Sequence, residues 1–398
     1  MGPKQFIPAT DPRVLVSGRC AATTDGALRF DWPATALRLA VRNLSSSGSV
    51  WLRMSASKSF FAVSSGSGDS RRTLAAMKRG VVDYELPITN AASSSASDGV
   101  SVIDIVKRTE ARPAFGLLFA KSGGIVTLHG VVLESGDGEL VAPPPFPSRV
   151  IEVIGDSDSC GFGCEGPRTG TDLRSLLRGA TRPADQDASR AWPALVGVAL
   201  DAQAHCIAWS GMGACWNAPF TDPKEPMSVF WDRLVADDAA AGTASSTAAA
   251  PDAVVVYLGG NDYWTMGATP PFGRAQPGRT EGHFVDGLAV FLRVLRAARS
   301  APIPIVVLAA DEQSGSFLPT RSEQATFSRT MQRLLAAAIE RAALDEHVHL
   351  IPLGGEPAIS VDDDADWGLM AHWSVQGHAK VARGVAARIG ERLRWSVR

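Results

Sequence analysis

The second half of the chain alternates short apolar runs with segments of helical period, and this alternation limits its fold more than any other feature. The apolar runs, rich in Val and Ile, lie at residues 150–154, 204–209, 253–258, 303–309 and 348–352. The helical segments lie at residues 188–200, 285–299, 322–343 and 375–394. Strands that are apolar along their whole length are typical of a parallel sheet buried on both faces. We therefore predict an α/β domain with a parallel sheet and helices on both faces.

The first 140 residues show a different pattern, in which short β-type runs are separated by clusters of Gly, Ser and Asn. These runs lie at residues 37–41, 50–54, 102–106, 115–119 and 125–133. Alternation such as Leu37-Arg38-Leu39-Ala40-Val41 puts the apolar side chains on one face of a strand. Sheets with one apolar face pack against each other, so we predict a β-sandwich without helices.

A proline-rich stretch, Pro143-Pro144-Pro145-Phe146-Pro147, separates the two patterns. Each proline removes a backbone donor and stiffens the chain, which interrupts a strand ladder. We therefore expect a β-sandwich domain at residues 1–145 and an α/β domain at residues 146–398. Two stretches rich in Ala and Ser, residues 90–98 and 236–251, are expected to be a solvated loop and an inserted loop.

Charge and hydropathy exclude several classes of partner. The 39 basic and 41 acidic residues nearly balance, so the chain lacks the excess positive charge that nucleic acid attracts. No apolar run is long enough to span a bilayer, and the first residues lack the apolar core of a secretion signal. We expect a soluble monomer. The compartment stays open, because the numbering can begin after a removed signal.

The cysteines do not form a zinc-binding pattern. They are odd in number, and the Cys160/Cys164 pair has no second pair to complete a metal site. Buried free thiols are expected, with a Cys160–Cys164 disulfide as the alternative. The acidic run at residues 362–364 is expected to be a solvated loop. No cluster of acidic or histidine residues has a spacing that demands a metal, so we expect no metal and no cofactor.

The stretch Gly155-Asp156-Ser157 follows the first apolar run of the second half and can present a serine hydroxyl at the end of a buried strand. In parallel α/β sheets, ligands bind at the carboxyl ends of the strands. Ser157 is therefore a candidate nucleophile, which needs a base and donors for the oxyanion. Alone, the tripeptide is equally typical of a strand-to-helix turn in which Ser caps the helix.

Two further strand ends supply such donors. Ser210-Gly211-Met212-Gly213 offers the amide of Gly211 with no side chain in the way, and Gly259-Gly260-Asn261 offers the side-chain amide of Asn261 in a tight turn. Three such signals in this order make a set of plain turns improbable.

A base is available late in the chain, where His372 and His378 precede and enter the last helical segment. His378 falls inside the expected helix and fits a core or capping role. His372 lies in the loop before the helix, so we assign it as the base.

The blocks around Ser157, Gly211, Asn261 and His372 resemble the four blocks of the SGNH (GDSL) hydrolases, esterases with a flavodoxin-like sheet. The chain is most similar to the carbohydrate esterase family two deacetylases, which carry a jelly-roll-like β-sandwich before the SGNH domain. The similarity extends to Gly18-Arg19, Phe30-Asp31-Trp32-Pro33, Lys107-Arg108-Thr109-Glu110, the Cys-Gly-aromatic-Gly motif at residues 160–163, and Ser374-Val375-Gln376-Gly377-His378. This resemblance implies an acetyl esterase acting on carbohydrate.

The chain departs from that family beside the base. Where the family has Asp two residues before the histidine, this chain has Met370, and Trp373 replaces a proline. Methionine cannot accept the Nδ1 proton as a carboxylate does. Either a Ser-His dyad operates with a backbone carbonyl orienting the ring, or another acid reaches the histidine, for which Asp366 is the nearest candidate with Asp364 behind it. We favour the dyad.

The implied reaction is acyl transfer from acetylated xylan, mannan or a related glycan, with the amides of Ser157 and Gly211 and the side chain of Asn261 as oxyanion donors. Sugar rings stack on flat apolar surfaces, and Trp216, Trp264 and Trp373 adjoin the blocks, although each is equally suited to a core. The alternatives are a catalytically weakened carbohydrate-binding protein, and an acyltransferase or lipid esterase on the same scaffold.

Overall fold

The computed structural model describes most of the chain. The described residues are 4–44, 48–65, 71–78, 80–88, 99–112, 124–134, 138–219, 221, 223–245, 250–266, 276–299, 302–310, 320–344, 346–353, 359, 361 and 363–398. The expected strand at 115–119 and the expected loop at 90–98 lie outside them.

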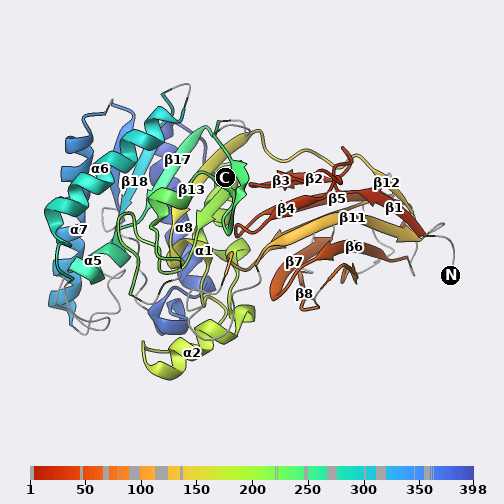
Figure 1. Ribbon diagram of the computed structural model, residues 1–398, viewed down its shortest axis with the longest axis horizontal. Helices are drawn as coiled ribbons and strands as arrows, with labels where there is room; N and C mark the ends of the chain where they lie inside the picture. The colour runs from red at the N-terminus through yellow and green to blue at the C-terminus, as the bar shows by residue number, and fades with distance from the viewer. Residues whose placement is uncertain are drawn as a thin grey trace.

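Two antiparallel sheets form the N-terminal part, at the right of Figure 1. One sheet has the order β3-β4-β11-β6-β9 with β1 paired to β11, and the other has the order β12-β5-β10-β7-β8 with β2 paired to β5. Their strands are β1 (Lys4–Pro8), β2 (Leu15–Ser17), β3 (Ala21–Ala22), β4 (Leu28–Phe30), β5 (Ala36–Arg42), β6 (Val50–Ser55), β7 (Ser59–Ser65), β8 (Arg72–Ala76), β9 (Val82–Glu85), β10 (Val100–Lys107), β11 (Val126–Glu134) and β12 (Glu139–Val141).

The predicted alternation explains why these sheets pack face to face. In β5, the even-numbered Arg38 is partly exposed, whereas Leu37 and Leu39 are buried against the other sheet. The core of this part also takes Leu52 from β6 and Leu128 from β11, which belong to the opposite sheet. The N-terminal β-sandwich is thus confirmed.

A parallel sheet forms the second part, with the order β14-β13-β17-β18-β19. Its strands are β13 (Arg149–Gly155), β14 (Ala202–Ala208), β17 (Ala253–Tyr257), β18 (Ile305–Ala309) and β19 (Val348–Pro352). This is the 2-1-3-4-5 order of flavodoxin-like folds, in which the connection reverses direction beside the first strand. Every residue of β17 and β18 is buried, as the continuous apolar runs predict.

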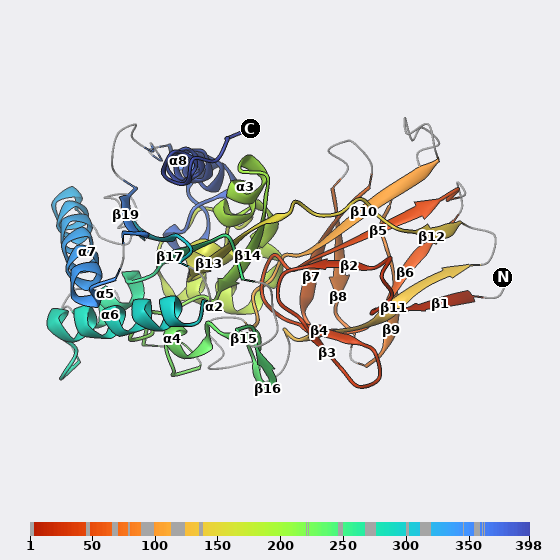
Figure 2. The same cartoon turned by 90° about the horizontal axis from the view of Figure 1, so that it is seen from above.

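Helices cover both faces of this sheet, as Figure 2 shows with α3 and α8 on one side and α6 on the other. The helices are α1 (Ser157–Cys160), α2 (Leu173–Thr181), α3 (Trp192–Ala199), α4 (Met227–Phe230), α5 (Gly260–Met266), α6 (Glu281–Ala297), α7 (Arg321–Ala342) and α8 (Val375–Leu393), with short 3-10 turns η1 (Pro183–Asp185), η2 (Ala188–Arg190), η4 (Asp364–Asp366) and η5 (Leu369–Ala371). The predicted helix at 188–200 is in fact divided into η2 and α3. None of the described helices is long and apolar enough to cross a membrane.

The stretch at 236–251 was expected to be a loop, and this expectation is wrong for its described first part. Strands β15 (Arg233–Val235) and β16 (Asp238–Thr243) pair as an antiparallel hairpin. The carboxylate of Asp31, from the sandwich, accepts hydrogen bonds from the amides of Ala236 at 2.6 Å and Asp237 at 2.8 Å. A partner distant in sequence therefore fixes the turn of a segment whose composition alone resembles a loop.

Candidate active site

Ser157 is the first residue of α1, and only Asp156 separates it from the end of β13. Asp156 is the N-cap, and its carboxylate accepts the amide of Asp158 at 3.1 Å, so the capping role falls to Asp156 and leaves the serine side chain free for another partner. A Cβ on Gly155 would lie 2.1 Å from Oγ of Ser159, which restricts that position to glycine and keeps the turn tight.

His372 meets Ser157 across 215 positions of the chain, with Nε2 lying 2.8 Å from Oγ of Ser157. Its other ring nitrogen, Nδ1, lies 3.0 Å from the carbonyl oxygen of Met370 and 3.2 Å from that of Leu369. A carbonyl oxygen can only accept, so Nδ1 carries the proton and Nε2 presents its lone pair to the serine hydroxyl. The contact between Ser157 and His372 that the sequence predicts is present.

A left-handed turn before His372 brings these carbonyls to the ring. Met370 and Ala371 both have φ of 57°, a region that non-glycine residues rarely adopt. Thr169 holds the turn from the loop after α1: its Oγ1 accepts the amide of Met370 at 3.0 Å, and its carbonyl accepts the amide of Ala371 at 3.0 Å. No sequence motif singled out Thr169.

Burial controls the basicity of His372. The side chain is 7% exposed and packs edge-on against the ring of Phe162 at 4.9 Å between centroids. Burial lowers the pKa of His372 to about 4, and the hydrogen bonds to the carbonyls of Met370 and Leu369 offset only part of this effect. The ring is therefore neutral at pH 7 and able to accept a proton.

Asp366 is occupied elsewhere. Its carboxylate lies 2.6 Å from Nζ of Lys380 and accepts the amide of Asp363 at 3.1 Å, which caps η4. The contacts of Nδ1 described above are made with carbonyl oxygens. Asp364, the second candidate, forms an ion pair with Arg168 at the surface.

The two oxyanion candidates border the same cleft as Ser157. Gly211 has φ of 78°, and a Cβ there would lie 2.1 Å from Oγ1 of Thr221, so only glycine is accommodated. The side-chain amide of Asn261 donates to the Asp156 carboxylate at 3.0 Å and to the carbonyl of Met212 at 2.9 Å. These two bonds fix the orientation of the amide beside the nucleophile.

Asp262 ties the Gly211 loop to α5. Its carboxylate, fully buried, accepts the amides of Ala214 at 2.8 Å, Cys215 at 2.7 Å and Trp216 at 2.8 Å. Burial raises the pKa of Asp262 to about 6, while the three amides oppose the rise. The sequence predicted Asn261 as a residue of the site, but it did not indicate that the neighbouring Asp262 holds the Gly211 loop.

A cleft opens at the carboxyl end of the sheet around these groups. Its polar border includes Ser157, Asn261 and His372. Its apolar lining includes Phe162, Tyr257, Leu258, Trp264, Phe327 and Met331. Phe327 and Met331 come from one face of α7, at a spacing of four residues. The sequence predicted a helix here but did not show which of its faces borders the cleft.

The sequence of the second part matches a known family. The model of the GDSL-like lipase/acylhydrolase family matches residues 153–380, which include Ser157, Gly211, Asn261 and His372. The chain belongs to this family.

Curated relatives of this GDSL-like protein include two esterases. An acetylxylan esterase / glucomannan deacetylase of Cellvibrio japonicus is 24% identical over 279 residues, which are 66% of this chain and 65% of that protein. The cellulase/esterase CelE of Acetivibrio thermocellus is 30% identical over 177 residues, which are 43% of this chain and 18% of that protein. The chain thus matches less than two thirds of the length of either relative.

The GDSL-like chain also has the fold of solved carbohydrate esterases over its whole length. A family two carbohydrate esterase from Cellvibrio japonicus superposes with a TM-score of 0.73 at 19% identity, covering 99% of each chain. At this identity the likeness concerns the fold, including the β-sandwich that precedes the parallel sheet.

The three candidate tryptophans of this GDSL-like protein have different surroundings. Trp264 lines the cleft and stacks on Phe327 with 5.6 Å between ring centroids. Trp373 is 1% exposed and stacks on Tyr257 within the core. Trp216 is half-buried under the guanidinium of Arg279, and neither it nor Trp373 is among the described residues that line the cleft.

His378 and three of the five cysteines lie in the core. Nδ1 of His378 lies 3.3 Å from the amide of Trp192, and the ring meets Trp373 edge-on. All five cysteines are free thiols: Cys160, Cys164 and Cys206 are buried, and Cys20 and Cys215 are partly buried. Burial raises the pKa of the Cys160 thiol well above its usual range, so it is not a competing nucleophile. Within the described part, no three His, Cys, Asp or Glu side chains are grouped so as to hold a metal ion.

Proposed function

We propose that the chain is a serine esterase that removes O-acetyl groups from carbohydrate of the acetylated xylan or mannan type, with a Ser157–His372 dyad. The contact of 2.8 Å between Nε2 of His372 and Oγ of Ser157 carries the proposal, together with carbonyl acceptors that hold the proton on Nδ1. The names of the two curated relatives support the substrate class.

In the first half-reaction, Oγ of Ser157 attacks the acetyl carbonyl carbon while Nε2 of His372 takes its proton. The C–O bond to the sugar then breaks, and His372 returns the proton to the departing sugar oxygen. The product is an acetyl ester on Ser157. The position of His372 is suited to both transfers because its Nε2 already faces Oγ.

The tetrahedral oxyanion requires donors that are fixed in advance. We assign this role to the amides of Ser157 and Gly211 and to Nδ2 of Asn261, which border the cleft. Both N–H groups of the Asn261 side chain already donate, to Asp156 and to Met212. One of them must therefore share its proton between its present acceptor and the oxyanion.

In the second half-reaction, water takes the place of the sugar. His372 removes a proton from the water, and the water oxygen attacks the acetyl carbon. The bond from that carbon to Oγ of Ser157 then breaks, His372 returns the proton to Oγ, and acetate leaves. The carbonyl of Met370 fixes the tautomer but carries no full negative charge, so it stabilises the imidazolium less than a carboxylate does. A lower turnover than that of a triad enzyme is the expected consequence.

Acetate release from a small aryl acetate and from acetylated xylan, by the native chain and by Ser157→Ala, tests the proposal. We expect the alanine variant to lose activity by roughly a thousandfold or more, with unchanged Tm. A native chain that binds the glycan but releases no acetate would instead be a carbohydrate-binding protein. Preferential transfer of acetate to an added sugar, or preference for long acyl chains, would replace the proposal with an acyltransferase or a lipid esterase.

A further inference from the structure

Three motifs of the N-terminal sandwich lie at its contact with the parallel-sheet part. Nη2 of Arg19 lies 2.6 Å from the carboxylate of Glu152 on β13, which Arg299 binds from the other side at 2.7 Å. Asp31 binds the amides of the β15–β16 turn, as described above. The third motif, Lys107-Arg108-Thr109-Glu110, directly follows β10.

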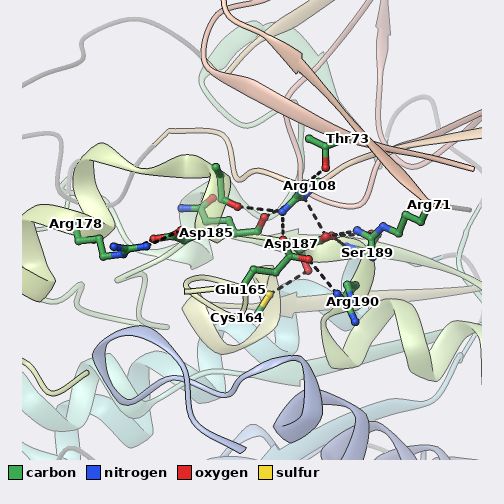
Figure 3. Close-up of polar contacts among 12 residues, drawn as sticks. Arg71, Thr73, Arg108, Cys164, Glu165, Arg178, Asp185, Asp187, Ser189 and Arg190 are labelled. Atoms are coloured by element: carbon green, nitrogen blue, oxygen red, sulfur yellow. Dashed lines mark hydrogen bonds and ion pairs between the residues drawn. The ribbon is translucent and has the colours of Figure 1, made fainter. Parts of the chain in front are cut away.

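Arg108 anchors this third motif, as Figure 3 shows. Its guanidinium donates to Oγ1 of Thr73 at 2.7 Å and forms ion pairs with Asp187 at 3.0 Å and with Glu165. Arg71 binds Asp187 separately and donates to Oγ of Ser189 at 2.7 Å. The sandwich is thereby fixed to the segment between α1 and α3, which contains α2 and the turns η1 and η2.

Glu110 extends from this anchor to the candidate active site. Its side chain is fully buried, and Oε2 accepts the backbone amide of Ser210 at 2.7 Å, immediately before Gly211. The same oxygen lies 3.7 Å from Sγ of Cys160, at the end of the helix that Ser157 begins. Oε1 accepts the side-chain amide of Gln186 at 2.8 Å.

The amide of Ser210 needs such a partner. The ladder between β13 and β14 ends at the pair Gly155 and Ala208, two residues before Ser210. A buried backbone N–H without an acceptor is costly, so the chain here depends on an acceptor from outside the sheet. Glu110 supplies it from the sandwich.

Lys107 sets the direction of Glu110. Its ammonium is fully buried and donates to the carbonyl oxygens of Thr109 at 2.5 Å and Glu110 at 3.0 Å. Its positive charge also faces the carboxylates of Asp31 and Glu110. The Lys107 ammonium thus bridges two backbone carbonyls of the bend after β10. This holds the Glu110 carboxylate at the boundary of the two parts.

We propose that Glu110 is a positioning residue for the oxyanion site, although it belongs to the β-sandwich. One carboxylate oxygen contacts both the loop that carries Gly211 and the helix that begins at Ser157. It therefore fixes the spacing of the two backbone amides assigned to the oxyanion. This inference rests on the proposed function, because it presumes that those amides act in catalysis.

Three variants at Glu110 and one control variant distinguish a positioning role of Glu110 from a purely stabilising one. Glu110→Leu removes the acceptor for Ser210. Glu110→Gln keeps one acceptor oxygen for Ser210. Its side-chain NH₂ group would then face the NH₂ group of Gln186, and neither of the two can accept a hydrogen bond. In the double variant Glu110→Gln/Gln186→Glu, residue 110 accepts from Ser210 and donates to residue 186, so every hydrogen bond is restored with the charge moved. Arg71→Ala weakens the same boundary without contact to Ser210.

For an aryl acetate, we expect Glu110→Leu to lower kcat on the order of a hundredfold with little change in KM, as for a damaged oxyanion site. The kcat of Glu110→Gln should lie between those of the native chain and Glu110→Leu. The double variant should regain most of the native kcat. Arg71→Ala should lower Tm but keep kcat. Hydrogen exchange of the Ser210 amide should become faster in Glu110→Leu and return to the native rate in the double variant.

The outcomes are distinct for the two proposals. A Glu110→Leu protein with reduced Tm and native kcat would overturn the positioning role, as would a double variant that regains Tm but not kcat. If Glu110→Leu does not fold, Glu110→Gln and the double variant decide between these results. An inactive native chain would refute the esterase proposal, and the exchange rate of Ser210 would then still show whether Glu110 holds this amide.

Discussion

The carbonyl oxygen of Met370 lies 3.0 Å from Nδ1 of His372, in the place where a carboxylate would orient the ring of a triad enzyme. The backbone can do this because Met370 and Ala371 adopt left-handed conformations. Such residues cost about 1–3 kcal/mol each, so the surrounding structure must hold them. The hydrogen bonds to Thr169 on both sides of the turn provide this support.

Met370→Asp should not restore a triad. The backbone carbonyl of Met370, and not its side chain, faces Nδ1, and the side chain is buried in the apolar cluster that contains Phe162 and Leu369. We expect kcat/KM for an aryl acetate to stay level or fall by about tenfold, with Met370→Leu as the control of similar volume. A gain of several orders of magnitude would show that the native chain has nearly lost its activity for want of an acid.

Thr169→Val should lower turnover by loosening the turn. The substitution keeps the shape of the side chain but leaves the Met370 amide without its acceptor, which costs about 1–3 kcal/mol where the group is buried. We expect kcat to fall by about tenfold, whereas Thr169→Ser, which keeps the hydroxyl, should remain close to native. Equal kcat in the two variants would contradict a role for this bond.

Activity should persist in acid. Because burial lowers the pKa of His372 to about 4, the neutral, proton-accepting ring prevails above that pH. We expect the full loss of kcat/KM that reports His372 to occur near pH 4, since kcat/KM follows ionisation of the free enzyme, and any smaller decline near pH 6 to report protonation of Asp262, which holds the Gly211 loop. Circular dichroism at each pH provides the control for unfolding. Full loss of activity near the usual histidine value would instead indicate that a carboxylate supports the ring.

Asp366→Ala should affect stability more than chemistry. The change removes one of the two carboxylates that bind Lys380 and the acceptor of the Asp363 amide at the start of η4, so Tm should fall. Turnover should remain within about tenfold of native, whereas loss of a triad acid costs roughly ten-thousandfold. Asp363→Ala, which removes the exposed second partner of Lys380, is the matched control. A loss of the larger size in Asp366→Ala alone would identify Asp366 as the acid.

Trp264 should contribute to binding of the glycan, whereas Trp216 should not. Trp264→Phe keeps a ring in the core but reduces the flat surface at the cleft. We expect KM for an acetylated oligosaccharide to rise about tenfold, equivalent to about 1.4 kcal/mol, and to be unchanged in Trp216→Phe. The reverse ranking would place the sugar on the other side of the Gly211 loop.

The sequence predicted the parts of this protein that follow from local pattern. Apolar runs located β13, β14, β17, β18 and β19, and the residues at their ends located Ser157 and Asn261. Such patterns do not show contacts between distant segments, so neither Thr169 nor the function of Glu110 was foreseen. For the same reason the identity of a tryptophan did not show whether its ring faces the cleft, as Trp264 does, or the core, as Trp373 does.

The thiols buried around the active site offer a measure of folding. Burial raises the pKa of Cys160, Cys164 and Cys206, so each remains protonated and shielded in the native state. An alkylating reagent can reach them only when the parallel-sheet part opens. The rate at which the reagent labels these three residues therefore reports the opening of that part directly, without substrate and without an engineered label.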